Sequence, residues 1–340
     1  MTISRKKQIC LEETPYYHCV SRCVRRAFLC GEDTFSGNNY EHRRDWVVDQ
    51  LKQLTKVFSI DICAYAVMHN HTHNVVMIDK QRALAWSNDE VIDRWTTLYK
   101  PSPIVARYLD GIRLSKAEQS VVNQDIEKWR HRLYDISWFM RNLNETIARM
   151  ANEEDNCTGR FWEGRFKSQA LLDEAALLTC MSYVDLNPIR AGIANTPESS
   201  DFTSIQERIR YYHKKLNQTD NATEAQISAP KGLVPFTGGE HQEKKPGLIF
   251  SLADYLELTD WAGRAIRYDK SGAIPSQLSP ILERLNIDPE AWLDTVKNYN
   301  KNYYNIVGTR EAIKDYSVAL DRKWFCLTRS SSQLYRTSTT

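Results

Sequence analysis

Three histidines that alternate along an apolar stretch constrain the fold more than any other feature of this chain. Residues 64–77 read AYAVMHNHTHNVVM, with His69, His71 and His73 at every second position. The β-branched and aromatic residues of 59–67 predict a strand, and HTHNVVMI predicts a second strand after a tight MHN connection. The chain is therefore expected to form a β-hairpin here.

The alternation of side chains along a strand places His71 and His73 on one face of this hairpin and Thr72 on the other. Two neutral imidazoles on one sheet face can hold a divalent cation. A pair of ordinary surface or core histidines has the same pattern, so the spacing alone leaves both interpretations open. His69 has the same parity but lies in the turn, and we do not expect it to be a primary ligand.

The elements around the hairpin predict an α+β fold. Residues 16–24 alternate as a strand, with His18, Val20 and Arg22 on one face. RRDWVVDQLKQLTKVF and DISWFMRNLNETIARMAN have the periodicity of helices. GRFWEGRFKSQALL then predicts a turn and a further strand, and EAALLTCMSYVDLNP predicts a helix that Pro188 stops. The order is β-α-β-β-α-β-α, and up to the last strand it is the ferredoxin-like split arrangement of an antiparallel sheet.

Composition changes along the chain predict its division into domains. Residues 80–134 are polar and irregular, as in an insertion with helices of its own. Residues 215–246 are rich in Gln, Thr, Asn, Gly and Lys and are interpreted as a linker. Residues 247–340 are helical in pattern, so we predict that residues 1–214 fold alone and precede a helical C-terminal domain.

Charge and cysteine content exclude some classes of protein. Charged residues make up 26% of the chain and the net charge is +2, which excludes a uniformly basic coat but not local basic patches. The 8 cysteines form no CxxC pair, which favours free thiols in a reducing cytoplasm. The N-terminus lacks the apolar stretch of a signal peptide, and no run approaches the roughly 18 apolar residues of a membrane span.

Three ordered motifs resemble one family of DNA-processing enzymes. AYAVMHNHTHNVV resembles the histidine motif of HUH nucleases, and FWEGRFKSQALL and YVDLNPIRAGI resemble two further motifs of REP-associated tyrosine transposases. Those are single-tyrosine transposases of small bacterial insertion sequences. The resemblance spans residues 15–195 and implies the HUH nuclease fold. In two departures, Thr72 stands where an aliphatic or aromatic residue is usual, and His69 stands where the family often has Pro.

The resemblance implies a nucleophilic tyrosine, and the matching residue is Tyr183. Asn187 lies four residues later, so both side chains would project from one helix face. The resemblance then implies the Asn187 amide as the third ligand beside His71 and His73, with Mg²⁺ or Mn²⁺ as the metal. Before Pro188, Asn187 also suits a helix C-cap, and Tyr183 also suits a core aromatic.

The implied activity is transposition, in which single-stranded DNA is cut and rejoined through a covalent 5′-phosphotyrosine, with hairpin or repeat sequences as the expected target. Cationic side chains can bind the phosphates of a single strand, and aromatic side chains can stack on its unpaired bases. On this basis the predicted DNA-binding residues are Arg22, Arg160, Trp162, Arg165, Lys167 and Arg190. For any one residue of GRFWEGRFKS, an ordinary solvated or buried strand face is an equal alternative, and Arg22 after the first strand and Arg190 after the helix of Tyr183 are weaker candidates. The implied location is the bacterial cytoplasm at the nucleoid, and a homodimer is compatible with the resemblance.

Other functions stay open on the sequence. An HUH replication initiator typically has Lys where Asn187 stands, and a relaxase would use a tyrosine near the N-terminus such as Tyr16 or Tyr17. A non-catalytic binder of hairpin DNA or RNA belongs to a different class. So does a zinc hydrolase, which would need Asp61 or Asp79 as its general base.

Overall fold

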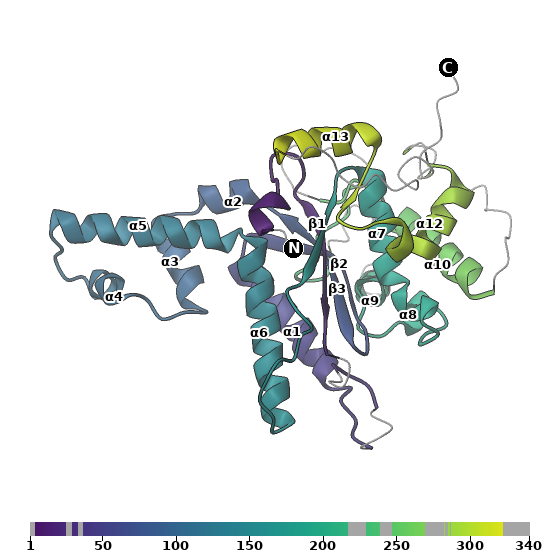
Figure 1. Cartoon of the computed structure of the whole chain (residues 1–340), viewed down its shortest axis with the longest axis horizontal. Helices are drawn as coiled ribbons and strands as arrows, with labels where there is room; N and C mark the ends of the chain where they lie inside the picture. The colour runs from purple at the N-terminus through teal and green to yellow at the C-terminus, as the bar shows by residue number, and fades with distance from the viewer. Residues whose placement is uncertain are drawn as a thin grey trace.

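The chain folds around a five-stranded sheet in a mixed α+β architecture (Figure 1). The computed structural model describes residues 4–24, 29–32, 37–216, 229–238, 247–268, 282, 285 and 287–321. The strand order is β2-β3-β1-β4-β5, and neighbours are antiparallel except for the parallel pair of β4 and β5. The strands are Tyr16–Arg22 (β1), Ile60–Val67 (β2), His71–Ile78 (β3), Lys167–Leu171 (β4) and Ile306–Val307 (β5).

Helices cover both faces of this sheet (Figure 1). On one face lie α1 (Arg43–Val57) and α6 (Ile136–Glu154), whose apolar residues recur at helical spacing. On the other face lie α7 (Glu174–Asp185) and α9 (Ser204–Leu216). Because both faces are covered, β2 and β3 are buried along most of their length, which explains the apolar run around the histidines.

The predicted hairpin is present in the sheet. β2 and β3 pair as antiparallel neighbours, with Ala66 opposite His73 and Val67 opposite Thr72. The elements β1, α1, β2, β3, α6 and β4 also follow one another in the predicted order. β1 lies between β3 and β4, so the first strand of the chain becomes the neighbour of the histidine strand.

The helix after β4 ends earlier than the sequence predicted. α7 stops at Asp185, and α8 (Asn187–Arg190) begins directly after Leu186, with Pro188 in its first turn. Proline suits the first turn of a helix because its missing N–H needs no partner there. The prediction that Pro188 stops this helix and the interpretation of Asn187 as its C-cap were therefore wrong, since the helix ends at Asp185 and Asn187 opens a new one.

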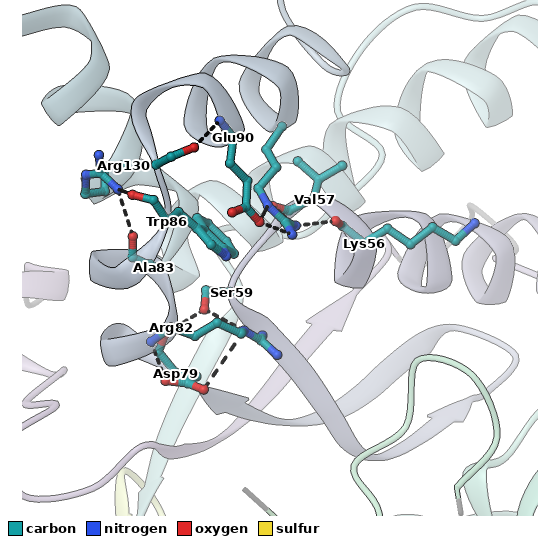
Figure 2. A network of polar contacts seen from close by, with 11 residues as sticks. Lys56, Val57, Ser59, Asp79, Arg82, Ala83, Trp86, Glu90 and Arg130 are labelled. Atoms are coloured by element: carbon teal, nitrogen blue, oxygen red, sulfur yellow. Dashed lines mark hydrogen bonds and ion pairs between the residues drawn. The ribbon is translucent and has the colours of Figure 1, made fainter. Parts of the chain in front are cut away.

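The predicted insertion is a set of helices that extends away from the sheet at the left of Figure 1. Arg130 donates to the carbonyls of Ala83 and Trp86, as Figure 2 shows, and Arg94 donates to the Lys56 carbonyl at the end of α1. The last carbonyls of a helix have no partner within it, so Arg94 ties the insertion to α1. The helices are Lys80–Ala85 (α2), Asn88–Thr96 (α3), Pro103–Leu109 (α4) and Lys116–Leu133 (α5).

Elements near the C-terminus share the core on the α7 side of the sheet. α12 (Pro289–Asn302) packs against α7 and against α10 (Leu252–Tyr268), and β5 extends the sheet beside β4. α13 (Arg310–Ala319) follows β5, and its Tyr316 hydroxyl donates to the Gln8 carbonyl near the N-terminus. These contacts tie the predicted C-terminal domain to the predicted N-terminal one, and the division between them remains a prediction.

The predicted linker is described in part. Its residues 229–238 lie beside the edge strand β2, where the Val234 N–H donates to the Ile62 carbonyl at 2.8 Å. Residues 217–228 and 239–246 lie outside the described residues. Two short 3-10 helices, Arg5–Lys7 and Pro197–Ser199, complete the described elements. Among the described helices, none has the length and apolar character needed to cross a membrane.

Candidate active site

His71 and His73 lie together on the face of β3 that α7 covers. Their ring centres are 4.8 Å apart and the ring planes are nearly perpendicular, while Thr72 between them is buried toward the other face. The alternation of the strand predicts this arrangement. His73 is 2% exposed, so the pair lies at the base of the site and not on an open surface.

His69 lies apart from this pair, in the exposed turn between β2 and β3. Its ring packs against Gly31, whose φ of +100° is a conformation that favours glycine. A Cβ at position 31 would come within 2.9 Å of a ring carbon of His69. The His69 carbonyl also accepts from the N–H groups of Leu29 and Cys30, so this residue organises the turn.

A third imidazole, which the sequence analysis did not single out, belongs to the site. His18 projects from β1 toward α7, and its Nε2 lies 2.9 Å from Nδ1 of His73. The two rings stack with centres 5.1 Å apart and an interplanar angle of 14°. The alternation of residues 16–24 predicts that His18 shares a strand face with Val20 and Arg22. Only the pairing of β1 with β3 brings His18 next to His73.

A chain of hydrogen bonds sets which nitrogen of each imidazole carries the proton. The Gln169 amide N–H donates to the Tyr304 carbonyl at 3.0 Å, which leaves its Oε1 to accept from the Tyr299 hydroxyl at 2.6 Å. The same oxygen lies 3.3 Å from His18 Nδ1, so that nitrogen is the one that donates. Nε2 of a neutral His18 then accepts from Nδ1–H of His73, and His73 keeps a lone pair on its Nε2.

This lone pair faces Asn187. The distance between His73 Nε2 and the Asn187 amide nitrogen is 3.2 Å, and a half-turn of the amide would present its oxygen instead. His71 Nδ1 lies 2.7 Å from the Asn70 side-chain oxygen, which leaves the His71 lone pair on Nε2 as well. Two imidazole lone pairs and an amide oxygen are groups that could serve as ligands of a divalent cation.

Within the described part of the chain, no cluster of three or more His, Cys, Asp or Glu side chains has metal-binding geometry. The candidate set is of a different kind, because its third member is the amide of Asn187. Burial keeps all three imidazoles of the site neutral. It lowers the pKa of His71 and of His18 to about 4 and that of His73 well below its usual range. Neutral imidazole is the form that binds metal ions.

These shifts predict how the stability of the metal-free protein depends on pH. The unfolded chain protonates its histidines near pH 6.5, whereas folded His18 stays neutral until about pH 4. The free energy of unfolding should therefore be highest above pH 6.5 and should decrease as the pH falls toward 4. The decrease expected from His18 alone is about 3 kcal/mol. Urea unfolding in EDTA across this range measures the effect.

His18→Gln should flatten this acid-side loss of stability, because it removes one buried imidazole. His131→Gln, at an exposed position near the end of α5, is the matched control and should leave the pH dependence unchanged. An identical acid-side loss in the wild-type protein and in His18→Gln would contradict the assignment of His18 as a buried neutral imidazole.

Tyr183 on α7 completes the group around His73. Its ring centre lies 5.5 Å from that of His73 in an edge-on arrangement, and Tyr299 of α12 stacks on it at 4.5 Å. The Arg190 guanidinium lies 4.8 Å from the centre of the Tyr183 ring. Burial raises the pKa of Tyr183, while the charge of Arg190 and a hydrogen bond with Asn187 act in the opposite direction.

Tyr183 is covered in this arrangement, since it is 1% exposed and Tyr299 lies over its ring. Beside the histidines, a cavity of about 760 Å³ opens to solvent, within the size range of about 300–1,000 Å³ for ligand pockets. His18, His71 and His73 line the cavity, but Tyr183 does not. A phosphate in the cavity would therefore meet the Tyr183 hydroxyl only after Tyr299 or Tyr183 moves.

Part of the predicted DNA-binding set lines this cavity: Arg22, Arg165 and Lys167. The other members lie elsewhere. The Trp162 indole N–H donates to the Asn144 carbonyl at 2.7 Å, and Arg190 donates to the Lys297 carbonyl at 2.7 Å. Arg160 is exposed and outside the cavity lining.

Comparison with known proteins gives one distant structural likeness. No protein-family model matches the chain, and no curated protein sequence is similar to it. A solved structure of a REP-associated tyrosine transposase bound to a REP hairpin is similar with a TM-score of 0.37 and 12% identity, over 68% of this chain and 96% of that one. So loose an overlap sets no residue correspondence.

Proposed function

We propose that this protein is a metal-dependent tyrosine transposase that cuts and rejoins single-stranded DNA, with hairpin or repeat sequences as its targets. One observation carries the proposal. His73 has Asn187 3.2 Å from one ring nitrogen, His71 beside it and Tyr183 edge-on, which supports a role of these residues as metal ligands next to a nucleophilic phenol. The cations of the adjacent cavity suit a phosphate backbone.

The proposed cleavage is a phosphoryl transfer. The Tyr183 oxygen attacks phosphorus and loses its proton, the 3′ oxygen leaves and takes up a proton, and the 5′-phosphotyrosine keeps the energy of the broken bond. A 3′-OH can reverse the step and rejoin DNA. When bound, a divalent cation at His71, His73 and Asn187 supplies charge that polarises the phosphate and orients it for in-line attack.

The residues of the chain contribute to this step in distinct ways. Arg190 favours the ionised phenol because its guanidinium lies over the Tyr183 ring. Arg22 and Lys167, at the cavity, would hold phosphates of the strand. The strand order β2-β3-β1-β4, with α1 and α6 on one face, supports the ferredoxin-like arrangement that the HUH nuclease assignment requires.

Two rival functions are less well supported by the geometry. For a relaxase, Tyr17 is badly placed, because its hydroxyl bonds to Cys10 and Tyr316 in the core on the opposite side of the sheet. For a zinc hydrolase, Asp61 forms an ion pair with Arg82 at 2.8 Å, away from the cavity that the histidines line. The cleavage assay separates a non-catalytic hairpin binder from the proposal, and Asn187 argues against a replication initiator, which typically has Lys at that position.

The assay uses single-stranded oligonucleotides with and without a hairpin. With Mn²⁺ or Mg²⁺, the protein should cleave the strand and form a covalent adduct, and it should do neither in EDTA. His71→Ala and His73→Ala should each reduce cleavage by more than about 100-fold, since even residues that only orient a metal ligand cost 10–100-fold. Asn187→Ala should weaken metal binding and slow cleavage.

His69→Ala is the matched control, because His69 belongs to the turn and not to the ligand set. It should keep most of the activity. Full activity of the wild-type protein in EDTA would overturn the metal site, and DNA binding without any cleavage would favour the non-catalytic binder. We further propose that the protein acts at the nucleoid, and gel filtration on hairpin DNA would show whether it acts as a homodimer.

A further inference from the structure

The connection between α12 and β5 is hydrogen-bonded to β4 beside the cavity. The Gln169 side chain donates to the Tyr304 carbonyl at 3.0 Å, and the Ala170 N–H donates to the Asn305 carbonyl at 2.9 Å. Tyr303 next to it is 4% exposed and ends α12, since its N–H donates to the Tyr299 carbonyl. The backbone of this connection is therefore fixed by the site itself.

Tyr304 differs from its neighbour, because 70% of it is exposed although its backbone is anchored. Single exposed apolar residues are common on protein surfaces and need no explanation. Tyr304, however, lines the same cavity as His71 and His73. A large aromatic ring held in solvent beside a polar site gains little for folding, and it is available to a ligand.

The charges around Tyr304 indicate which ligand suits the cavity. Among the described residues, Arg22, Arg165 and Lys167 line it together with a single acidic residue, Glu163. An aromatic surface next to cations is the combination that binds unpaired nucleotides, because bases stack on the ring and phosphates meet the charges. Asn300 and Asn305, which flank Tyr304 in the sequence, also line the cavity.

We propose that Tyr304 is the stacking platform for an unpaired base of the DNA strand that enters the cavity. The proposal rests on the proposed function, and it gives the C-terminal region a direct part in substrate binding. Tyr304 precedes β5 and Lys167 begins β4, and both line the cavity, so the strand is expected to lie between the two parts of the chain. The base that stacks is expected to lie next to the phosphate that reaches the histidines.

The test measures binding of fluorescein-labelled 20-nucleotide strands, oligo(dT), oligo(dA) and a hairpin with a single-stranded flank, to the full chain. Tyr304→Ala should weaken binding of single strands roughly tenfold, the usual effect of losing one stacked base. Tyr304→Trp should retain affinity because indole also stacks. Val318→Ala, 71% exposed on α13 and outside the cavity lining, is the matched control and should bind as the wild type.

A second readout locates the base. A strand carrying 2-aminopurine at successive positions should show quenched fluorescence at one position, and Tyr304→Ala should restore it. If the wild-type protein forms the adduct, and Tyr304→Ala has the same affinity and the same quenching as the wild type, the stacking role is wrong and the proposed function stands. Binding that depends on Tyr304, without an adduct on any strand, would overturn the nuclease function and keep the stacking role. A wild-type protein that binds none of these strands would overturn both.

Discussion

Tyr183→Phe is expected to abolish the covalent protein–DNA adduct while leaving hairpin DNA binding within about twofold of the wild type, because the cations proposed to hold the phosphates remain. The substitution removes one oxygen, and the ring keeps its stacking on Tyr299 and its edge contact with His73. Folding should therefore change little. A denaturing gel with a labelled strand measures the adduct, and anisotropy measures binding.

Tyr17→Phe and Tyr16→Phe are the controls for this result. Tyr17 lies in the core on the far side of the sheet, and Tyr16 pairs with Met77 at the end of β3 remote from His71. Both variants should form the adduct, with any loss explained by stability. An adduct that persists in Tyr183→Phe and disappears in one of these variants would move the nucleophile to the N-terminal strand and favour the relaxase.

Removal of residues 215–340 is expected to abolish both cooperative unfolding and adduct formation. The truncation takes away Tyr299, which covers Tyr183, and Tyr255, whose hydroxyl donates to the buried Asp185 at 2.6 Å. Trp292 is also lost from the same core. Each large apolar side chain contributes about 1.5–3 kcal/mol when buried, and a folded domain is stable by about 5–15 kcal/mol in total.

This expectation runs against the boundary that the sequence predicts, so the experiment decides between them. Circular dichroism melting of the 1–214 fragment measures folding, and the labelled strand measures activity. As a control, the intact chain with a protease site engineered within residues 217–228 should stay assembled and active after cleavage, since both parts remain present. A folded and active 1–214 fragment would show that the sequence-based boundary is right.

Tyr299, which covers Tyr183, links the prediction for Tyr183→Phe with the prediction for the truncation. Tyr299 stacks on Tyr183 and also donates to Gln169, so one residue of α12 both shields the candidate nucleophile and contributes to the hydrogen bonds that orient His18 and His73. An aromatic that shields a phenol has to move before the phenol can reach a phosphate. The C-terminal region is therefore expected to respond to DNA and not only to stabilise the core.

The sequence by itself determined the features that depend on local periodicity. Alternation along a strand is a property of the backbone, so AYAVMHNHTHNVVM was sufficient to place His71 and His73 on one face and Thr72 on the other. Periodicity also predicted the β-α-β-β-α-β order, and a change in composition predicted the helical insertion. Even there, the end of α7 was misplaced, because proline both stops and starts helices and the sequence alone does not say which.

Only the tertiary structure decided which distant residues meet. β1 could have paired with any strand, and its position beside β3 is what brings His18 to His73 across 55 residues of chain. Tyr299 and Tyr304 lie more than a hundred residues beyond β4 in the sequence and reach the site through tertiary packing. No local sequence pattern predicts that packing. The reason is physical, since a strand's own sequence fixes which side chains share a face, whereas its neighbours depend on the hydrogen bonds and core packing of the whole sheet.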